Sequence, residues 1–362
     1  MKRRQFVGGL AAAAGLAACG KQESDCGGQA GSGETFEWSM VTSWPPAFPG
    51  LGTGAEKLAE SITEASGGRL KIKVYAGGEL VPAFEVFDAV SRGTVEMGHD
   101  ASYYHKGKVE AAQFFATIPF GLTATEMSAW LHHGGGIELW RELYEPHNLV
   151  PFMAGNTDTQ MGGWFNKEIN SIADLKGLKM RIPGMGGEVL RRAGGTPVTL
   201  PGSEIFTALQ TGAIDATEWV GPWNDSAFGF HKAAKYYYYP GWHEPGPVLE
   251  CIINKDAWNS LPADLQMLVK IACDAATHNM TAEYNYHNAV SLQQLLNNPD
   301  IEVRAFPKEV MARFKALSAE VIDELVERDP AAAKIMASFD EFRRISTANQ
   351  RIGVDAFLET RD

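Results

Sequence analysis

Alternating hydrophobic and polar residues in the first third of the chain predict strands that take turns with helices. Phe36 to Thr42 and Leu70 to Ala76 alternate with period two, the pattern of a half-buried strand. Between them, Leu51 to Ser66 carries apolar residues at helical spacing and ends at two glycines, as many helices do. A short helix from Phe84 to Gly93 and a strand from Val95 to Ala101 follow. This order predicts an α/β lobe with a mainly parallel sheet.

A second series of strands and helices begins near residue 149 and predicts a second α/β lobe. The expected strands are 149–154, 161–166, 178–182, 197–200 and 216–220, with helices near 184–194 and 203–212. Residues 236–254 then predict a long, mostly extended return. Because the chain would cross more than once between two lobes, the pattern indicates a hinged, two-lobed clam-shell of the periplasmic-binding-protein kind.

The last hundred residues have helical periodicity. Residues 261–297 predict one long connecting helix, and the apolar residues of 310–325 predict another. Asp329 before Pro330 favours a capped start of a further helix. This C-terminal helix, 331–362, has an apolar stripe that either packs on the protein's own core, which we favour, or exchanges with a partner helix in a homodimer.

The expected α/β organisation combines these segments in two lobes with long connecting and C-terminal helices. Lobe I takes residues 36–155 and about 245–284, and lobe II takes residues 156–244 and about 285–330.

The first 35 residues predict export and tethering. Residues 1–18 combine a charged start, which includes a twin-arginine-like pair, with an apolar run too short to span a membrane, as a secretory signal peptide does. They end in Leu-Ala-Ala, and with Cys19 this resembles a bacterial lipobox, in which Cys19 is lipidated; ordinary cleavage nearby is the alternative. Residues 19–35, rich in Gly, Ser and Gln, predict a flexible tether. We expect a periplasmic protein anchored by lipid to the membrane.

Charge, cysteines and motifs narrow the function classes. The formal net charge of -12 argues against nucleic acid as a partner. The spacing of the four cysteines fits no zinc pattern, and Cys251 and Cys273 are expected to be small buried residues, with a disulfide between them as the alternative. The sequence has no Gly-x-Ser-x-Gly elbow, no dinucleotide-binding glycine motif, no Walker loop and no His-Glu-x-x-His. A binding protein is therefore favoured over an enzyme.

Arg181 stands inside the apolar strand 178–182. Burying an arginine is costly unless an anion meets it, and its planar fork matches a carboxylate. We therefore expect a cleft that captures a small carboxylic acid. The alternative is that Arg181 bridges an internal Asp or Glu.

Five short motifs occur in a characteristic order along the chain. They are Ser43-Trp44-Pro45, Gly77-Gly78-Glu79-Leu80, Asp174 to Arg181, Leu209 to Asp215, and Asn254 to Pro262. With them, residues 36–310 resemble the extracytoplasmic solute-binding proteins of tripartite ATP-independent periplasmic (TRAP) transporters. The resemblance implies a receptor that closes on a solute and delivers it to the subunits of a TRAP membrane permease.

Within that family, the chain resembles the branch that binds 2-oxo or 2-hydroxy monocarboxylates together with a metal cation. The residues behind this are Asn156 to Gln160, Glu218-Trp219 and the aromatic run Tyr236 to Glu244. The resemblance implies that Arg181 pairs with the ligand carboxylate, that Asn156 contacts the ligand, and that Tyr103 or Tyr104 closes from the other lobe.

The same resemblance implies a cation site. Gln160, Glu218 and the main-chain carbonyl of Trp219 would hold the cation, with Glu244 as a further candidate, while Trp44 and Trp219 would form apolar walls. A 2-oxo or 2-hydroxy acid offers two adjacent oxygens to a hard cation. Carboxylate, amide and carbonyl oxygens suit sodium or calcium rather than zinc. One glutamate favours sodium, and calcium becomes the better choice if Glu244 and the ligand carboxylate join.

Three histidines, His99, His105 and His243, are interpreted as structural and are assigned no chemistry. Two other functions stay open at this point: an exported enzyme that acts on a carboxylic acid, for example a lyase, and a periplasmic sensor for the same acid. The enzyme requires a poised general base, whereas the sequence does not separate the sensor from the transport receptor.

Overall fold

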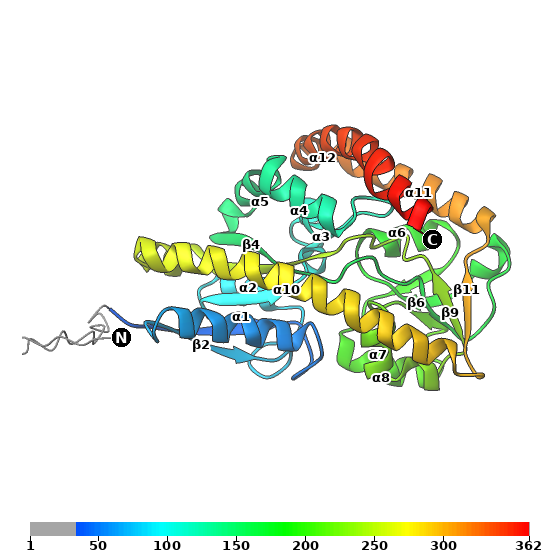
Figure 1. The fold of residues 1–362 in the computed structure, drawn as a ribbon, viewed down its shortest axis with the longest axis horizontal. Helices are drawn as coiled ribbons and strands as arrows, with labels where there is room; N and C mark the ends of the chain where they lie inside the picture. Colours follow the sequence, from blue (N-terminus) through cyan, green and yellow to red (C-terminus); the bar gives the residue numbers. More distant parts are fainter. Residues whose placement is uncertain (1–33, 362) are drawn as a thin grey trace, which may run out of the picture. The chain divides into compact units, whose positions relative to one another are not determined.

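The two sheets expected from the sequence are both present in the computed structural model, which describes residues 34–361 (Figure 1). Residues from Thr35 onward form one compact unit. The expected signal peptide, Cys19 and nearly all of the tether lie outside the described residues. Within residues 34–361, no helix has the length and apolar character needed to cross a membrane.

The first sheet has the strand order β2-β1-β3-β10-β4. β1 (Phe36–Thr42) pairs in parallel with β2 (Leu70–Tyr75) and with β3 (Met97–Asp100). β10 (Val248–Asn254) runs antiparallel between β3 and β4 (Leu149–Asn156). The prediction of a mainly parallel sheet is confirmed, with β10 as the one antiparallel strand, because it enters from the direction of the second sheet.

The second sheet has the strand order β11-β9-β5-β8-β6-β7. Its strands are β5 (Gly163–Phe165), β6 (Lys179–Arg181), β7 (Thr196–Val198), β8 (Ala216–Thr217), β9 (Tyr236–Tyr239) and β11 (Glu302–Ala305). β6 pairs in parallel with both β7 and β8, and Arg181 is the last residue of β6. The register of β6 and β8 sets Arg181 opposite Thr217, so the residues that follow both strands meet at the same edge.

The mostly extended return predicted for 236–254 is present, but it consists of two strands in different sheets. β9 belongs to the second sheet and β10 to the first, and the loop 240–247 joins them. Pro240 ends β9 because a proline has no N–H to continue a strand ladder. This loop carries His243 and Glu244 between the two sheets, which matters for the site below.

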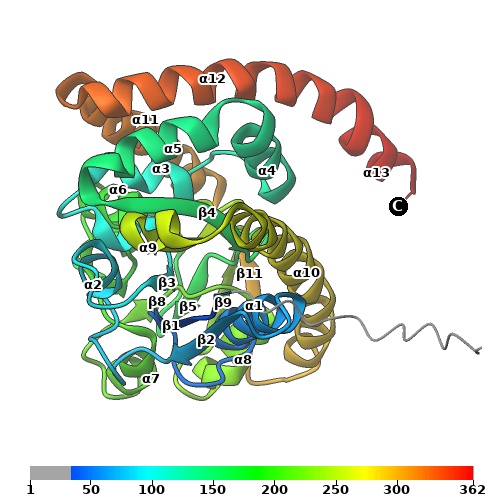
Figure 2. The same ribbon diagram turned by 90° about the vertical axis from the view of Figure 1, so that its left-hand side faces the viewer.

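Helices surround both sheets, and α10 connects them. The α-helices are α1 (Gly52–Ala65), α2 (Val86–Ser91), α3 (Gln113–Ala116), α4 (Ala124–His133), α5 (Gly136–Tyr144), α6 (Gly184–Arg192), α7 (Gly202–Gln210), α8 (Pro222–Phe228), α9 (Lys255–Ser260), α10 (Ala263–Leu296), α11 (Lys308–Arg328), α12 (Pro330–Gln350) and α13 (Ala356–Arg361). α10 has 34 residues and contacts β4, α1 and α8; its contact with α1 through Glu283 comes just before its contacts with α8 through Tyr284 and Asn288 (Figures 1 and 2). The single long helix expected there is confirmed.

Five short helices, α3, α4, α5, α8 and α9, were not expected from the sequence. α4 starts with a capping box. The Thr123 side chain accepts a hydrogen bond from the main-chain N–H of Glu126, and the Glu126 carboxylate accepts one from the main-chain N–H of Thr123. The Thr-x-x-Glu spacing is a sequence signal of a helix start, so α4 was open to prediction.

The C-terminal helix begins as predicted. The Asp329 carboxylate accepts hydrogen bonds from the main-chain N–H groups of Ala331 at 2.8 Å and Ala332 at 3.3 Å. The first half of α12 packs on the core through Ile335 and Phe339, as we favoured. Beyond it, large apolar side chains are exposed: Ile345, Ile352, Val354, Phe357 and Leu358.

Both internal cysteines, Cys251 and Cys273, are buried and free. The disulfide considered as an alternative is not formed, and the interpretation of two small buried residues is confirmed.

Candidate functional site

A small cavity lies where strands of the two sheets end. Its free volume in this structure is about 10 Å³, so the wall side chains nearly fill it. Six of its wall residues were predicted as site residues: Trp44, Tyr103, Tyr104, Gln160, Arg181 and Trp219. Trp44 follows β1, the two tyrosines follow β3, Arg181 ends β6, and Trp219 follows β8. Ligands of α/β proteins bind outside the carboxyl ends of the strands, and this cavity has that position in both sheets at once.

Arg181 is 1% exposed and has partners on every side. Its guanidinium forms an ion pair with the Glu218 carboxylate, and Nε donates to the main-chain carbonyl of Leu200 at 3.2 Å. Nη2 lies 3.4 Å from the Tyr104 hydroxyl, and the Trp219 ring lies 5.0 Å from the guanidinium carbon. The internal bridge considered as an alternative for Arg181 is therefore present, and it joins Arg181, on the cavity wall, to Glu218, a second predicted site residue next to the wall residue Trp219.

Glu218 belongs to a buried cluster with His243 and Glu244. One carboxylate oxygen of Glu218 pairs with Arg181, and the other lies 3.4 Å from Nε2 of His243. The loop 240–247 brings the other two side chains to the end of β8. His243, to which the sequence analysis assigned no chemistry, is thus a neighbour of the predicted cation ligands. The contact between His243 and Glu218 was not predictable from the sequence, because the two residues are 25 positions apart and meet only where this loop approaches β8.

Two buried oxygens of the site have no hydrogen-bond partner among the described residues. They are Oε1 of Gln160 and Oε2 of Glu244. An unsatisfied buried polar atom costs about 1–3 kcal/mol, and such an atom calls for an explanation such as a water or an ion. Burial and the neighbouring Glu218 both raise the pKa of Glu244 well above its usual range. A cation bound at Glu244 would satisfy its unpartnered oxygen and would oppose the repulsion between the Glu218 and Glu244 carboxylates.

The apolar wall contributed by Trp44 is held in place by a histidine. The indole Nε1 of Trp44 donates to Nδ1 of His99 at 2.8 Å, and Nε2 of His99 faces the Ala154 carbonyl at 3.3 Å. Burial lowers the pKa of His99 to about 4, so the ring is neutral at pH 7. The structural role expected for His99 fits this arrangement.

Asn156 lies apart from the other predicted ligand contacts. It ends β4, is fully buried, and does not line the cavity. Its Nδ2 donates to the Gly246 carbonyl at 3.1 Å, and its Oδ1 accepts from the main-chain N–H of Asp158 at 2.8 Å. In this conformation Asn156 therefore positions two loops at the site, and direct contact with a ligand stays a prediction.

The remaining wall residues were not identified from the sequence. They are Leu51, Thr157, Val220, Pro247 and Leu249. Thr157 Oγ1 accepts a hydrogen bond from Nε2 of Gln160 at 3.1 Å. This bond fixes the amide of Gln160, whose Oε1 has no partner among the described residues. The apolar members carry no distinguishing signal, because buried leucines and valines occur throughout the two cores.

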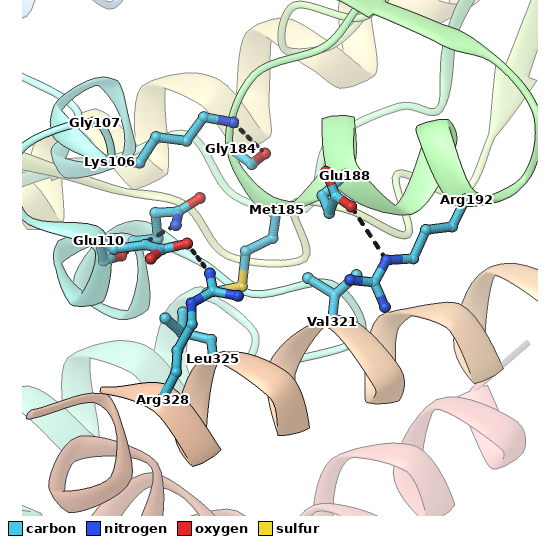
Figure 3. A pocket seen from close by; sticks show the side chains of 11 residues that line it. Lys106, Gly107, Glu110, Gly184, Met185, Glu188, Arg192, Val321, Leu325 and Arg328 are labelled. Carbon is cyan, nitrogen blue, oxygen red and sulfur yellow. Dashed lines mark hydrogen bonds and ion pairs between the residues drawn. The ribbon is translucent and has the colours of Figure 1, made fainter. Parts of the chain in front are cut away.

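A second pocket lies between the segment after β3 and helices α6 and α11 (Figure 3). In this pocket, the Lys106 ammonium donates to the Gly184 carbonyl at 3.0 Å, and Arg328 forms an ion pair with Glu110. Figure 3 shows both contacts crossing from one wall of the pocket to the other. They join the first lobe to the second beside the buried cavity.

The chain matches the family described as bacterial extracellular solute-binding protein, family 7, over residues 40–329. It is 43% identical to a monocarboxylate 2-oxoacid-binding periplasmic protein of Nostoc sp., over 97% of this chain and 96% of that protein.

Two solved structures have the same fold. A TRAP periplasmic solute-binding protein of Pseudoalteromonas atlantica with bound sodium and pyruvate is 42% identical, with a TM-score of 0.87 over 90% of this chain and 99% of that one. A TRAP transporter solute-binding protein of Bordetella bronchiseptica is 39% identical, with a TM-score of 0.89 over 91% and 98%. That protein is a mixed-occupancy dimer with calcium and picolinate in one site.

Proposed function

We propose that this chain, which belongs to family 7 of the bacterial extracellular solute-binding proteins, is a TRAP-transporter receptor for small 2-oxo or 2-hydroxy monocarboxylates bound together with a cation. It is a binding protein and not an enzyme, because its family and the relatives named above are solute-binding proteins. The observation that carries the proposal is a buried arginine and the unpartnered Oε1 of Gln160 on the wall of one cavity, with Arg181 paired to Glu218 and Glu218 clustered with the unpartnered carboxylate of Glu244.

Arg181 would orient the acid. Its fork matches a carboxylate, and Tyr104 approaches it from the first lobe at 3.4 Å. Since Arg181 is already fixed by Glu218 and Leu200, little side-chain freedom would be lost when an acid binds. Trp44, Leu51 and Leu249 add apolar surface to the wall of the cavity, which would face the side chain of a small acid.

Gln160, Glu218 and Glu244, with the main-chain carbonyl of Trp219, would hold sodium or calcium. The cation would supply positive charge to the two adjacent oxygens of a 2-oxo or 2-hydroxy acid. All four donors are oxygens, which suits these hard cations. The unpartnered oxygens of Gln160 and Glu244 support this assignment.

Binding would close the two lobes on the acid. The cavity walls come from both sheets, and a ligand that contacts both walls favours the closed state over an open one. The lobe boundaries expected from the sequence, with α10 as a connecting element, describe this motion and stay a prediction.

A stability screen tests the proposed ligand class. We expect pyruvate and other 2-oxo or 2-hydroxy monocarboxylates, added with calcium or sodium, to raise the melting temperature of residues 35–362 by several degrees. Saturation at 100 times Kd adds about 2.7 kcal/mol of stability, and about 2–4 °C accompanies each kcal/mol in a domain of this size. Dicarboxylates and sugars serve as controls. A larger shift with a dicarboxylate or a sugar than with pyruvate would contradict the ligand class.

Delivery and location follow from the family. The protein is a periplasmic receptor, and we propose that Cys19 carries a lipid that keeps it at the membrane, near the permease subunits that accept the acid. A sensor for the same acid would use the same cavity. Uptake of labelled pyruvate by cells with and without this protein separates the two roles, because only a transport receptor is required for uptake.

We further propose that the exposed end of the C-terminal helix contacts a second copy of the chain. Five large apolar side chains between residues 345 and 358 are exposed there, and one related structure is a dimer. Large exposed apolar patches mark interaction sites.

Removal of residues 344–362 is therefore expected to convert a dimer into a monomer without loss of acid binding, since none of these residues lines the cavity. Sedimentation velocity of the full and shortened proteins measures this. Equal sedimentation mass for both would contradict the proposed contact.

A further inference from the structure

A buried charged cluster lies behind the ligand cavity, in the first lobe. It consists of Asp100 at the end of β3, His105, and Glu250 on β10, all at most 2% exposed. Nε2 of His105 lies 2.9 Å from Oε1 of Glu250 and 3.2 Å from Oδ1 of Asp100. The Tyr144 hydroxyl, from α5, donates to Oε2 of Glu250 at 3.0 Å.

The strand register makes this cluster unfavourable without the histidine. Asp100 and Glu250 are direct partners across the antiparallel pair β3–β10. Like charges directly opposite each other destabilise a sheet, and burial strengthens the repulsion. His105 lies between the two carboxyl groups and bonds both, so it ties the residues after β3 to the sheet.

His105 is the last residue of the 3₁₀ turn η1 (Ser102–His105), which also carries Tyr103 and Tyr104. With three residues per turn, consecutive side chains point in three directions, and residues three apart share a face. Tyr103 and Lys106 therefore share one face, Tyr104 takes the second, and His105 takes the third.

The first two faces contact the second lobe. Lys106 donates to the Gly184 carbonyl at 3.0 Å (Figure 3), and Tyr104 approaches Arg181. The backbone of Gly184 has φ +61°, and a Cβ there would lie 3.4 Å from Cβ of Tyr103, so the turn packs directly on this glycine. The third face, His105, anchors the turn to the first sheet.

We propose that Asp100, His105 and Glu250 form a positioning cluster that holds η1 against the first sheet, so that Tyr103 and Tyr104 meet the ligand when the lobes close. The proposal rests on the proposed receptor function, because the two tyrosines act on a ligand. None of the three residues touches the cavity. They act through the turn.

Titration of the cluster gives the proposal a specific signature. The groups facing Glu250 are Asp100 from β3, His105 from η1 and Tyr144 from α5, while α2 contributes only the apolar ring of Phe87, 4.6 Å from the His105 ring. Burial and Asp100 raise the pKa of Glu250 to about 8. Burial opposes the charge on His105, but Asp100 and Glu250 outweigh it and raise its pKa to about 10.

The contribution of the cluster to the stability of the fold decreases as the pH rises. Both folded-state pKa values lie above the unfolded ones, so the stability contributed by the cluster is present at low pH and is lost as the pH rises through 8 and 10. Above pH 8 Glu250 ionises opposite Asp100, and η1 loosens. Glu250→Gln keeps the uncharged form at every pH and should remove this first step.

Calorimetric titration with pyruvate at pH 7 and pH 9, in calcium, tests the proposal. We expect wild-type affinity to fall about threefold or more between the two pH values, as an opposed like-charge pair predicts. Glu250→Gln should bind as wild type does at pH 7 and lose less at pH 9. Glu126→Gln is the control, since this acid caps α4 in the same lobe and does not touch η1. The same loss in wild type and Glu250→Gln would overturn the proposal.

Hydrogen exchange of residues 102–109 supplies a measurement that needs no ligand. After correction for intrinsic rates, exchange should speed up at pH 9 in wild type and not in Glu250→Gln. Equal exchange in both proteins overturns the positioning role even if no acid binds. Failure of wild type to bind any 2-oxo acid contradicts the receptor function instead, so the two failures are distinguishable.

Discussion

Replacement of Arg181 by alanine is expected to lower the affinity for pyruvate by at least about 30-fold, because removal of one partner of a buried charge contact costs about 2–5 kcal/mol in binding. The guanidinium is the one buried cation among the residues that line the cavity. Calorimetric titration of the purified protein with pyruvate, in calcium, measures the loss.

The same substitution should also destabilise the protein. Arg181→Ala leaves Glu218 buried without its ion-pair partner, and such a broken pair costs about 3–5 kcal/mol. The double variant Arg181→Ala with Glu218→Gln removes the uncompensated charge and should recover most of the melting temperature without recovery of binding. Recovery of the melting temperature would show that the instability of Arg181→Ala comes from the uncompensated charge of Glu218.

A matched control is Arg192→Ala on α6. Arg192 pairs with Glu188 and Glu324 at the protein surface and does not line the buried cavity. It should bind pyruvate as wild type does. Wild-type affinity in the Arg181 variants would show that the carboxylate binds elsewhere.

The strands and helices of this fold were largely predictable because they depend on local patterns. The period-two alternation of 36–42 and 70–76 and the helical spacing of 261–297 each report one buried face of one element. The break within 236–254 was not predictable in this way. Both halves are extended and apolar, and only pairing with β5 and β11 in one sheet and with β3 and β4 in the other assigns them to different lobes.

The candidate site was partly predictable, and the reason differs from residue to residue. Arg181 was conspicuous because a charge inside an apolar strand needs a partner. Its pairing with Glu218 depends on the adjacency of β6 and β8, which the sequence alone does not specify. The partners of His105 were not predictable, because Asp100 and Glu250 lie 5 and 145 positions away in sequence. Buried polar contacts between distant segments are where local patterns carry the least information.

Replacement of Glu244 by glutamine is expected to weaken the dependence of acid binding on calcium or sodium. Glu244 offers a buried oxygen with no partner among the described residues, beside Glu218. A neutral amide keeps the shape but removes half of the negative charge that the two carboxylates offer to a cation. We expect at least a tenfold loss of cation affinity, comparable to the 10–100-fold effects of weaker, outer-shell changes at metal sites.

Without acid or cation, the same substitution should stabilise the protein, which is the opposite of its effect on the loaded protein. Burial and Glu218 raise the pKa of Glu244 well above its unfolded value, so its contribution to stability is complete below the unfolded pKa and is lost as the pH rises. Without acid or cation, Glu244→Gln should therefore melt at a higher temperature than wild type at pH 8, and the difference should shrink towards pH 4. A ligand oxygen removed from a cation site thus stabilises the empty protein while it weakens the loaded one.

Melting curves at pH 4 and pH 8, with and without calcium, sodium and pyruvate, test both halves of this expectation. Glu250→Gln is the matched control, because it also neutralises a buried acid with a raised pKa but lies away from the cavity and should keep the response to cations. If Glu244→Gln responds to calcium and sodium as wild type does, the cation does not bind at Glu244. In that case the unpartnered oxygens of Gln160 and Glu244 require another explanation, such as bound water.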